Sequence, residues 1–111
     1  MGKPEGAVEN YLRNKIRGLG GFIEKWESPG TAGLPDEIVI FRGKTTFVET
    51  KAPGEKAREL QRLTMKEIRL AGGDARVIDT RDKVDDFIKE LLLLPELLLD
   101  PSESDQCLST R

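Results

Sequence analysis

Three ionisable residues, Asp36, Glu49 and Lys51, have the types and spacing that hydrolysis of a phosphodiester bond requires. Two carboxylates held side by side repel each other, and a hard cation relieves that repulsion. Oxygen ligands without nearby histidine or thiolate favour Mg²⁺ or Mn²⁺ over zinc. Such an ion activates water and neutralises charge on a phosphate, and the Lys51 ammonium adds a fixed positive charge. The residues therefore predict a metal-dependent phosphodiesterase site, provided that the fold brings them together.

Two short strands are expected to position this set, at residues 37–41 and 45–48, because both segments are rich in β-branched and aromatic residues. Between them, Gly43 at the first position of a two-residue loop suits a type II′ hairpin. This loop would place Ile40 opposite Phe47, Ile38 opposite Glu49, and Asp36 opposite Lys51 on the neighbouring strand. Opposed residues share a face, so the acids and the lysine should cluster at one end, with apolar side chains beside them. A surface hairpin with solvated or salt-bridged charges is the alternative.

Pro35-Asp36 followed by Glu49-Thr50-Lys51 resembles the PD-(D/E)XK nuclease motif, and a longer ordered string resembles the VRR-NUC family of that superfamily. The string spans about residues 7–79. Its matching positions are Gly20, Gly21, Lys25, Ser28, Pro29, Gly30, Gly33, Pro35, Asp36, Phe47, Val48, Glu49, Lys51, Ala52, Pro53, Gly54 and Gln61. The resemblance implies a restriction-endonuclease-like fold in a stand-alone protein of viral or phage type. It further implies that a homodimer cuts branched, flapped or four-way DNA with Mg²⁺ or Mn²⁺.

The resemblance also implies roles for individual residues. Asp36 and Glu49 would bind the metal ion, with the Thr50 backbone carbonyl as a further ligand, and Lys51 would be the catalytic lysine. Gln61 would support the site from the following helix.

An acid on the first helix would complete the site, directly or through a water. Spacing along that helix leaves Glu5 and Glu9 equally open, and the resemblance favours Glu9. Glu37 departs from the family pattern, where a basic or apolar residue is expected, and its charge beside Asp36 opposes DNA contact there.

Basic residues on a helix expected at residues 55–71 form a candidate DNA-backbone stripe, because their spacing places them on one face. They are Arg58, Arg62, Lys66 and Arg69. Lys25, on a strand expected at residues 22–27, could reach a phosphate. Ser28 and Gly30 lie in a Gly/Pro-rich loop whose backbone N–H groups could approach DNA closely. The alternatives are a solvated helix face, a solvated lysine and a simple connecting loop.

The remaining pattern predicts an α/β protein of order α-β-β-β-α-β-α, a mixed sheet flanked by helices. Helices are expected at residues 4–19, 55–71 and 82–94, the last capped by Asp79 or Thr80, and a strand at 75–78 should run parallel to the Glu49 strand. Residues 1–94 would form the nuclease domain. Residues 95–111 would be a leucine-containing extension with a polar tail. The leucine-rich segment 91–99 is too short and interrupted to span a membrane, and we expect it either to fold back on the core or to join two subunits.

Composition narrows the function class. The 111 residues carry a net charge of −2, which excludes a strongly basic DNA-binding protein. The charge is unevenly distributed, because residues 1–81 have a net charge of +3 and residues 82–111 a net charge of −5. One cysteine precludes an intrachain disulfide, and no signal-peptide pattern is present. We therefore expect a cytoplasmic protein, in a bacterial host cell if viral, that is not secreted. A non-catalytic DNA-binding or partner-binding module on a nuclease fold is the alternative function.

Overall fold

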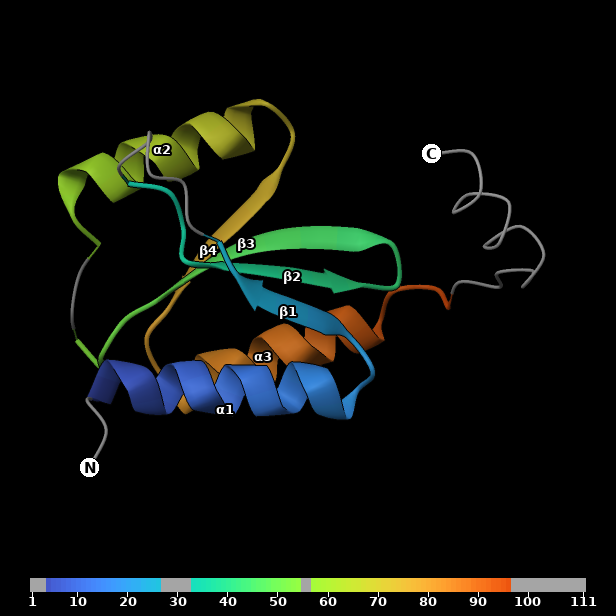
Figure 1. Ribbon diagram of the computed structural model, residues 1–111. Helices are drawn as coiled ribbons and strands as arrows, with labels where there is room; N and C mark the ends of the chain where they lie inside the picture. The colour runs from blue at the N-terminus through green and yellow to red at the C-terminus, as the bar shows by residue number, and fades with distance from the viewer. Residues whose placement is uncertain (1–3, 27–32, 55–56, 97–111) are drawn as a thin grey trace.

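A four-stranded mixed sheet of order β1-β2-β3-β4 forms the centre of the protein (Figure 1). The computed structural model describes residues 4–26, 33–54 and 57–96. Its elements are α1 (Pro4–Gly18), β1 (Phe22–Lys25), β2 (Glu37–Phe41), β3 (Lys44–Thr50), α2 (Glu59–Leu70), β4 (Asp74–Ile78) and α3 (Arg81–Leu92). Strands β1 to β3 pair antiparallel and β4 pairs parallel with β3. The predicted order of elements and the parallel β3–β4 pair are confirmed.

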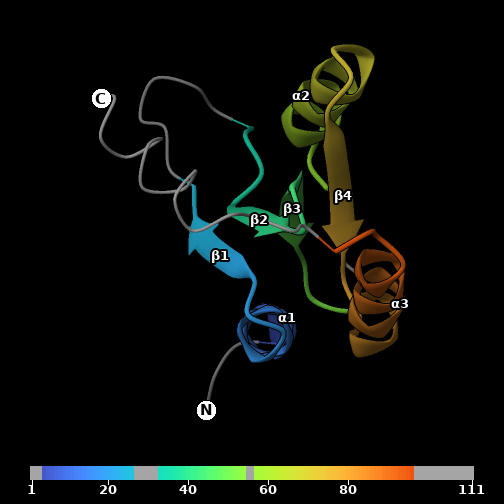
Figure 2. The same cartoon turned by 90° about the vertical axis from the view of Figure 1, so that its right-hand side faces the viewer.

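Helices cover the two faces of the sheet unequally. Helices α1 and α3 lie side by side under one face, whereas α2 lies on the other face, over β4 (Figures 1 and 2). The core fills the space between the sheet and the α1–α3 layer. Its buried members are Val8, Leu12, Ile16, Ile23, Val39, Phe41, Val48, Ile78, Val84, Phe87 and Leu91. The predicted stripe of α1 supplies the first three, because residues four apart share a helix face.

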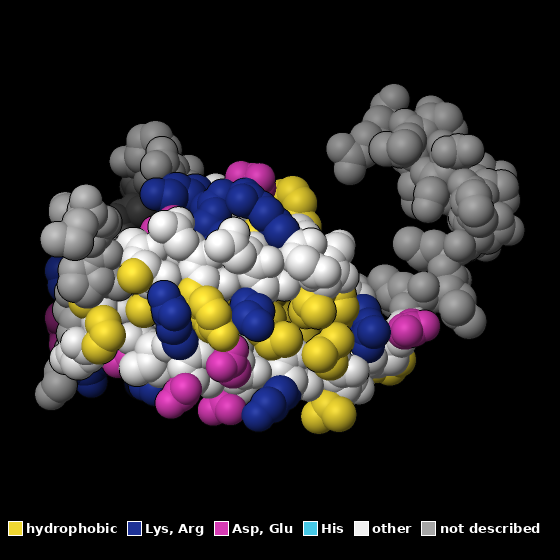
Figure 3. Space-filling model, turned by 90° about the horizontal axis from the view of Figure 1, so that it is seen from below, with side chains coloured by type: hydrophobic (Ala, Val, Ile, Leu, Met, Phe, Trp, Pro, Cys, Tyr) yellow, Lys and Arg dark blue, Asp and Glu magenta, His cyan; other side chains and the backbone are white. Residues whose placement is uncertain are grey.

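The outer surface of the α1–α3 layer carries basic, acidic and apolar side chains interspersed (Figure 3). This face therefore has no extended field of one sign, unlike a surface built to hold DNA by charge alone. No helix in the described part of the chain is long and apolar enough to cross a membrane.

The hairpin register is two residues away from the predicted one. The observed loop is Arg42-Gly43, so that Phe41 pairs with Lys44 and Ile38 with Phe47. Both loop residues have positive φ, 49° for Arg42 and 81° for Gly43, as a type I′ turn requires. A shift of two leaves every side chain on its predicted face, since side chains alternate with a period of two.

The packing predicted around the site is wrong in one respect. The hairpin residues that enter the core are Val39, Phe41 and Val48, which face α1 and α3. Ile40, expected to pack beside the acids, is exposed on the opposite face.

Several segment boundaries also differ from expectation, since β3 extends to Thr50 and α3 ends at Leu92. Helix α2 begins at Glu59 rather than residue 55, and it buries Gln61 and Met65 while its leucines at 60, 63 and 70 are exposed. Strand β1 ends at Lys25. Thr80 caps α3 by accepting the Lys83 N–H at 3.1 Å, as predicted.

The leucine-rich segment divides at the end of α3. Leu91 is buried and Leu94 packs against the core, whereas Leu92 and Leu93 are exposed. The Arg42 guanidinium donates to the carbonyls of Leu92 and Leu94 at 3.0 and 2.8 Å, which ties the hairpin tip to this helix end. Residues 97–99 lie outside the described residues.

Candidate active site

The end of β3 brings Glu49 and Lys51 together on the face covered by α2. The Lys51 ammonium lies 3.2 Å from Glu49 Oε2, and both side chains are buried. The Lys51 backbone N–H donates to the Ile78 carbonyl at 3.0 Å, which extends the β3–β4 pairing to this residue. A buried carboxylate and a buried ammonium are therefore held at the point where two parallel strands end.

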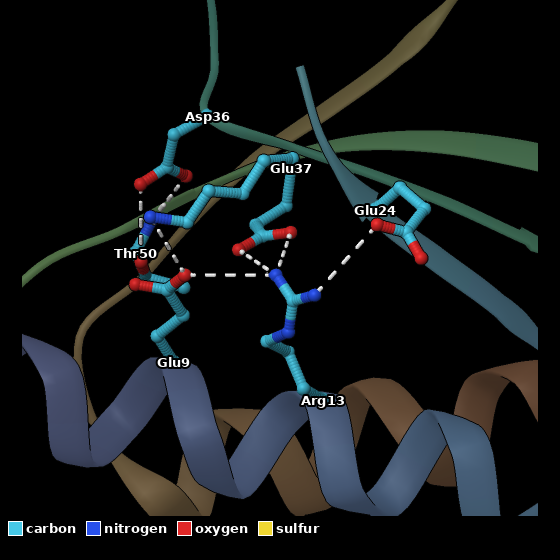
Figure 4. Close-up of polar contacts among 7 residues, drawn as sticks. Glu9, Arg13, Glu24, Asp36, Glu37 and Thr50 are labelled. Atoms are coloured by element: carbon cyan, nitrogen blue, oxygen red, sulfur yellow. Dashed lines mark hydrogen bonds and ion pairs between the residues drawn. The ribbon is translucent and has the colours of Figure 1, made fainter. Parts of the chain in front are cut away.

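Asp36 joins this pair through Thr50. Because β2 begins at Glu37, Asp36 lies just before the strand, and its carboxylate turns toward Thr50 (Figure 4). The Thr50 backbone N–H donates to Asp36 Oδ1 and the Thr50 hydroxyl donates to Oδ2, both at 3.3 Å. Asp36 is thus fixed beside the residue between Glu49 and Lys51. The observed register, continued by one residue, sets it opposite Glu49 instead of Lys51.

Gln61 connects the start of α2 to the acid on β3. Its amide nitrogen donates to Glu49 Oε2 at 3.0 Å, and its amide oxygen accepts the Arg58 backbone N–H at 3.0 Å. The side chain is buried. One amide therefore caps the helix and orients Glu49, in the position that sequence reasoning assigned to it.

The electrostatics at Asp36 are those of an acid next to another acid. Burial and the negative charge of Glu49, with a smaller contribution from Glu9, raise the pKa of Asp36 to about 6, and the Thr50 hydrogen bonds lower it in part. A carboxyl group with this pKa is ionised at neutral pH, but burial and the neighbouring acids make its ionised form less favourable than in water. A bound cation would relieve that cost.

The donor set fits a hard divalent cation held by two carboxylates. Mg²⁺ is usually bound through one or two carboxylates and keeps several waters or substrate oxygens, so Asp36 and Glu49 meet that need. Within the described ranges, no cluster of three or more Asp, Glu, His or Cys side chains is arranged to hold a metal ion. The Thr50 backbone N–H is held at the site by its bond to Asp36, and its carbonyl as a further ligand stays a prediction.

The helix acid Glu9 lies between two cations. Its Oε1 is 3.7 Å from Arg13 Nη1 and 3.6 Å from Lys25 Nζ. Its charge also reaches Asp36, since it raises the pKa of that residue. The side chain of Glu5 is outside the described part of the chain, so only Glu9 is placed.

Glu37 departs from the family pattern, and its charge was expected to oppose DNA contact beside Asp36, but the structure places it in the interior. It is fully buried against α1, where the Arg13 guanidinium donates to both carboxylate oxygens at 3.1 and 3.3 Å (Figure 4). Burial and Glu9 raise the pKa of Glu37 to about 8, and Arg13 opposes this rise. Alternation with Val39 and Phe41 was the available signal, since it places Glu37 on the core face.

The predicted DNA-binding residues fall into three groups. Arg62, Lys66 and Arg69 line a groove of about 380 Å³ beside α2 and β4, although the Arg69 guanidinium also donates to the Ala75 carbonyl at 2.6 and 2.8 Å. Arg58 is exposed at the start of the same helix. Lys25 is exposed beside Glu9. Ser28 and Gly30 lie outside the described residues.

No family model matches the chain, but a curated protein and a solved structure are similar to it. The sequence is 38% identical over 79 residues to "Putative nuclease p44" of Acyrthosiphon pisum secondary endosymbiont phage 1, which covers 70% of this chain and 85% of the relative. A solved structure described as a VRR_NUC domain superposes with a TM-score of 0.75 at 31% identity, over 79% of this chain and 97% of that one.

Proposed function

Because this chain belongs to the VRR-NUC family of nucleases, we propose that it is a Mg²⁺- or Mn²⁺-dependent DNA endonuclease that cuts branched DNA as a homodimer. The observation that carries the proposal is the junction of Glu49, Lys51 and Asp36 around the end of β3. Two carboxylates and one ammonium at this separation are the groups that phosphodiester hydrolysis needs, and Gln61 holds one of the acids in place.

Each residue of the site has a physical role in this proposal. A divalent ion, when bound by Asp36 and Glu49, supplies charge neutralisation and lowers the pKa of a water molecule. Lys51 places a fixed positive charge beside Glu49, where it can orient a water or the scissile phosphate. Thr50 fixes Asp36 and Gln61 fixes Glu49, so that neither acid needs to reorganise during the reaction.

Structure selectivity and dimerisation complete the proposal. The net charge of −2 favours weak non-specific binding, and neutralising few phosphates gives modest affinity that falls steeply with salt. Such a protein gains selectivity when two copies contact two arms of one junction. Exposed Leu92 and Leu93 at the end of α3 offer an apolar contact for the second copy.

The proposal is tested by incubating linear duplex, flapped and four-way DNA with and without Mn²⁺. Wild type is compared with Asp36→Asn and Lys51→Met, and Lys89→Met is the control because it removes the charge of an exposed lysine on α3, away from the proposed DNA-binding residues. We expect cleavage only with metal, faster on branched DNA, abolished by the first two substitutions and retained by the control. Calorimetric titration with Mn²⁺ should lose binding in Asp36→Asn and keep it in Lys51→Met.

Three results would overturn the proposal or its homodimer. Absence of cleavage with every divalent metal, on every substrate, would favour a non-catalytic DNA-binding module. Cleavage that persists in both site variants would place the active site elsewhere. Sedimentation that gives a monomer at micromolar concentration, with full activity, would remove the homodimer.

A further inference from the structure

Large apolar side chains are exposed on the open face of the sheet, over β1 and β2. Phe22 is 51% exposed, Trp26 43% and Ile40 40%. Phe22 pairs with Ile40 across β1 and β2, and Ile38 pairs with Phe47 across β2 and β3, so these side chains share one face. The Trp26 ring meets the Phe47 ring edge-on, with centroids 6.3 Å apart. We call Phe22, Trp26, Ile38, Ile40 and Phe47 the aromatic patch.

The side chains of the aromatic patch are not part of the hydrophobic core between the sheet and the α1–α3 layer. The alternate residues of the same strands, Ile23, Val39 and Phe41, already pack against α1 and α3. Helix α2 lies on the same face as the patch but over β4, at the opposite edge of the sheet from β1 (Figure 2). Apolar side chains of this size left in contact with water indicate a binding surface.

The aromatic patch continues directly into the candidate active site. Phe47 precedes Glu49 by two residues on β3 and shares its face. The Trp26 backbone N–H donates to the Asp36 carbonyl at 2.8 Å, which fixes the end of the patch beside the first acid. A strand of DNA whose phosphate lies at Asp36 and Glu49 therefore has its neighbouring nucleotides against Trp26 and Phe47.

The chemistry of the aromatic patch suits nucleobases better than phosphates. Glu24 lies on β1 between Phe22 and Trp26, but its carboxylate pairs with Arg13 at 3.8 Å. The five side chains of the patch carry no charge, and two phenyl rings and one indole offer stacking surfaces. Bases inside a duplex already stack on each other, and only unpaired bases can turn their faces to a protein. Stacking on an aromatic side chain contributes about 1–3 kcal/mol per base.

We propose that the aromatic patch binds unpaired nucleobases of the DNA substrate next to the scissile phosphate. This inference rests on the proposed nuclease function and gives it a physical basis for preferring branched DNA. Lys51 and the divalent ion attract the sugar-phosphate strand, and Trp26 and Phe22 hold the bases that a flap or a junction leaves unstacked. Fully paired DNA gains nothing from the patch.

The chain provides its own reporter for this test, because Trp26 is its single tryptophan. Fluorescence of Trp26, excited at 295 nm in EDTA to prevent cleavage, is followed during titration with three probes of equal length. These are a single-stranded oligonucleotide, a blunt duplex and an abasic oligonucleotide that keeps the phosphates but lacks the bases. We expect strong quenching by the first probe and little by the other two.

Variants then separate the aromatic patch from general DNA affinity. Phe22→Ala and Trp26→Ala should weaken single-strand binding, measured by fluorescence anisotropy of labelled DNA, by roughly 5- to 100-fold, as expected for one lost stacking contact. Leu70→Ala is the matched control, since Leu70 is equally apolar and 78% exposed but lies at the end of α2. The control should bind as wild type does.

The outcomes distinguish this inference from the proposed nuclease function. The inference would be overturned if the abasic probe quenched Trp26 as strongly as the single strand does, or if both patch variants kept the wild-type affinity. Neither result would contradict cleavage at the site formed by Asp36, Glu49 and Lys51. A loss of mass on sedimentation in Phe22→Ala, without loss of single-strand binding, would instead make the patch an interface between two copies. Base-dependent quenching in a protein that cleaves no DNA would support the patch and remove only the nuclease function.

Discussion

Gln61 performs two tasks with one amide, and two substitutions can separate them. Its oxygen accepts the Arg58 N–H and its nitrogen donates to Glu49 Oε2, both at 3.0 Å. Only this orientation of the amide satisfies a donor on one side and an acceptor on the other. Gln61→Ala removes both bonds. Gln61→Glu keeps the acceptor for Arg58 but replaces the donor to Glu49 with a second carboxylate.

The two substitutions differ in size and in pH dependence. Losing the cap costs about 1 kcal/mol, and losing a donor to a buried carboxylate costs about 1–3 kcal/mol, so Gln61→Ala should lose roughly 2–4 kcal/mol of unfolding free energy. In Gln61→Glu, two negative charges about 4 Å apart repel by about 4 kcal/mol near a protein surface. Lys51 beside Glu49 offsets part of this repulsion. At pH 8 Gln61→Glu should be the less stable variant, and at about pH 4, where one acid of the pair is protonated, it should be the more stable one.

Urea denaturation followed by circular dichroism at pH 8 and pH 4 measures this reversal in the relative stability of Gln61→Ala and Gln61→Glu. Calorimetry with Mn²⁺ should also show about 10- to 100-fold weaker binding to Gln61→Ala, the usual effect of removing a side chain that orients a metal ligand. A Gln61→Glu protein as stable as wild type at pH 8 would refute the reasoning, because it would mean that the amide makes no contact with Glu49.

Three further perturbations follow from other contacts. Arg13→Met leaves Glu37 buried without its guanidinium, so above pH 8, where Glu37 with its pKa of about 8 is ionised, it should lower the unfolding free energy by about 3–5 kcal/mol, whereas the double substitution with Glu37→Leu should recover much of the loss in urea denaturation. Burial alone would raise the pKa of Asp74, but hydrogen bonds from Arg76 and Lys44 hold this pKa below its usual value. Asp74 therefore adds stability above about pH 4 that is lost as pH falls through its lowered pKa, and melting curves of wild type and Asp74→Asn should converge at acid pH. Gly33→Ala should cost more than about 1 kcal/mol in the same denaturation assay, because Gly33 has φ of +86° and a Cβ would lie 2.9 Å from the Leu60 carbonyl.

Each of these has its own control. Glu24→Gln removes an exposed partner of Arg13 at 3.8 Å and should change stability little. A double variant of Arg13 and Glu37 no more stable than Arg13→Met would show that the cost is not the buried charge. Melting curves of Asp74→Asn that diverge further in acid would reverse the sign argued for that residue. Gly6→Ala, in a helix with open space around it, should raise stability by roughly 0.5–1 kcal/mol.

Local pattern predicted the elements of the fold well, because helix and strand periodicities are properties of short segments. It predicted the hairpin but not its register. Gly43 alone favours a type II′ loop, whereas the observed turn also requires positive φ at Arg42. The carbonyls of Leu92 and Leu94 hold that arginine from about fifty residues away, and such a contact leaves no trace in the local sequence.

The candidate site shows the same division between local and distant information. Alternation along β3 placed Glu49 and Lys51 on one face, and the spacing placed Gln61 at the start of the next helix. The burial of Glu37 depends on its contact with Arg13, which lies on α1. Which side chains of α2 are buried could not be predicted either, since the helix packs mainly over β4, reaches β3 through Gln61, and leaves its leucines exposed.

The placement of both acids on one hairpin has a consequence for the order in which the protein assembles. Strands β2 and β3 are joined by a two-residue loop, whereas the parallel β3–β4 pair requires the whole α2 crossover to close first. Contacts that are near in sequence form early in folding, and Glu49 lies 13 residues after Asp36 and 12 residues before Gln61, so both acids and Gln61 can come together before β4 pairs with β3. A divalent ion in the medium would then act on the nascent chain by shielding like charges, well before any nucleic acid is encountered.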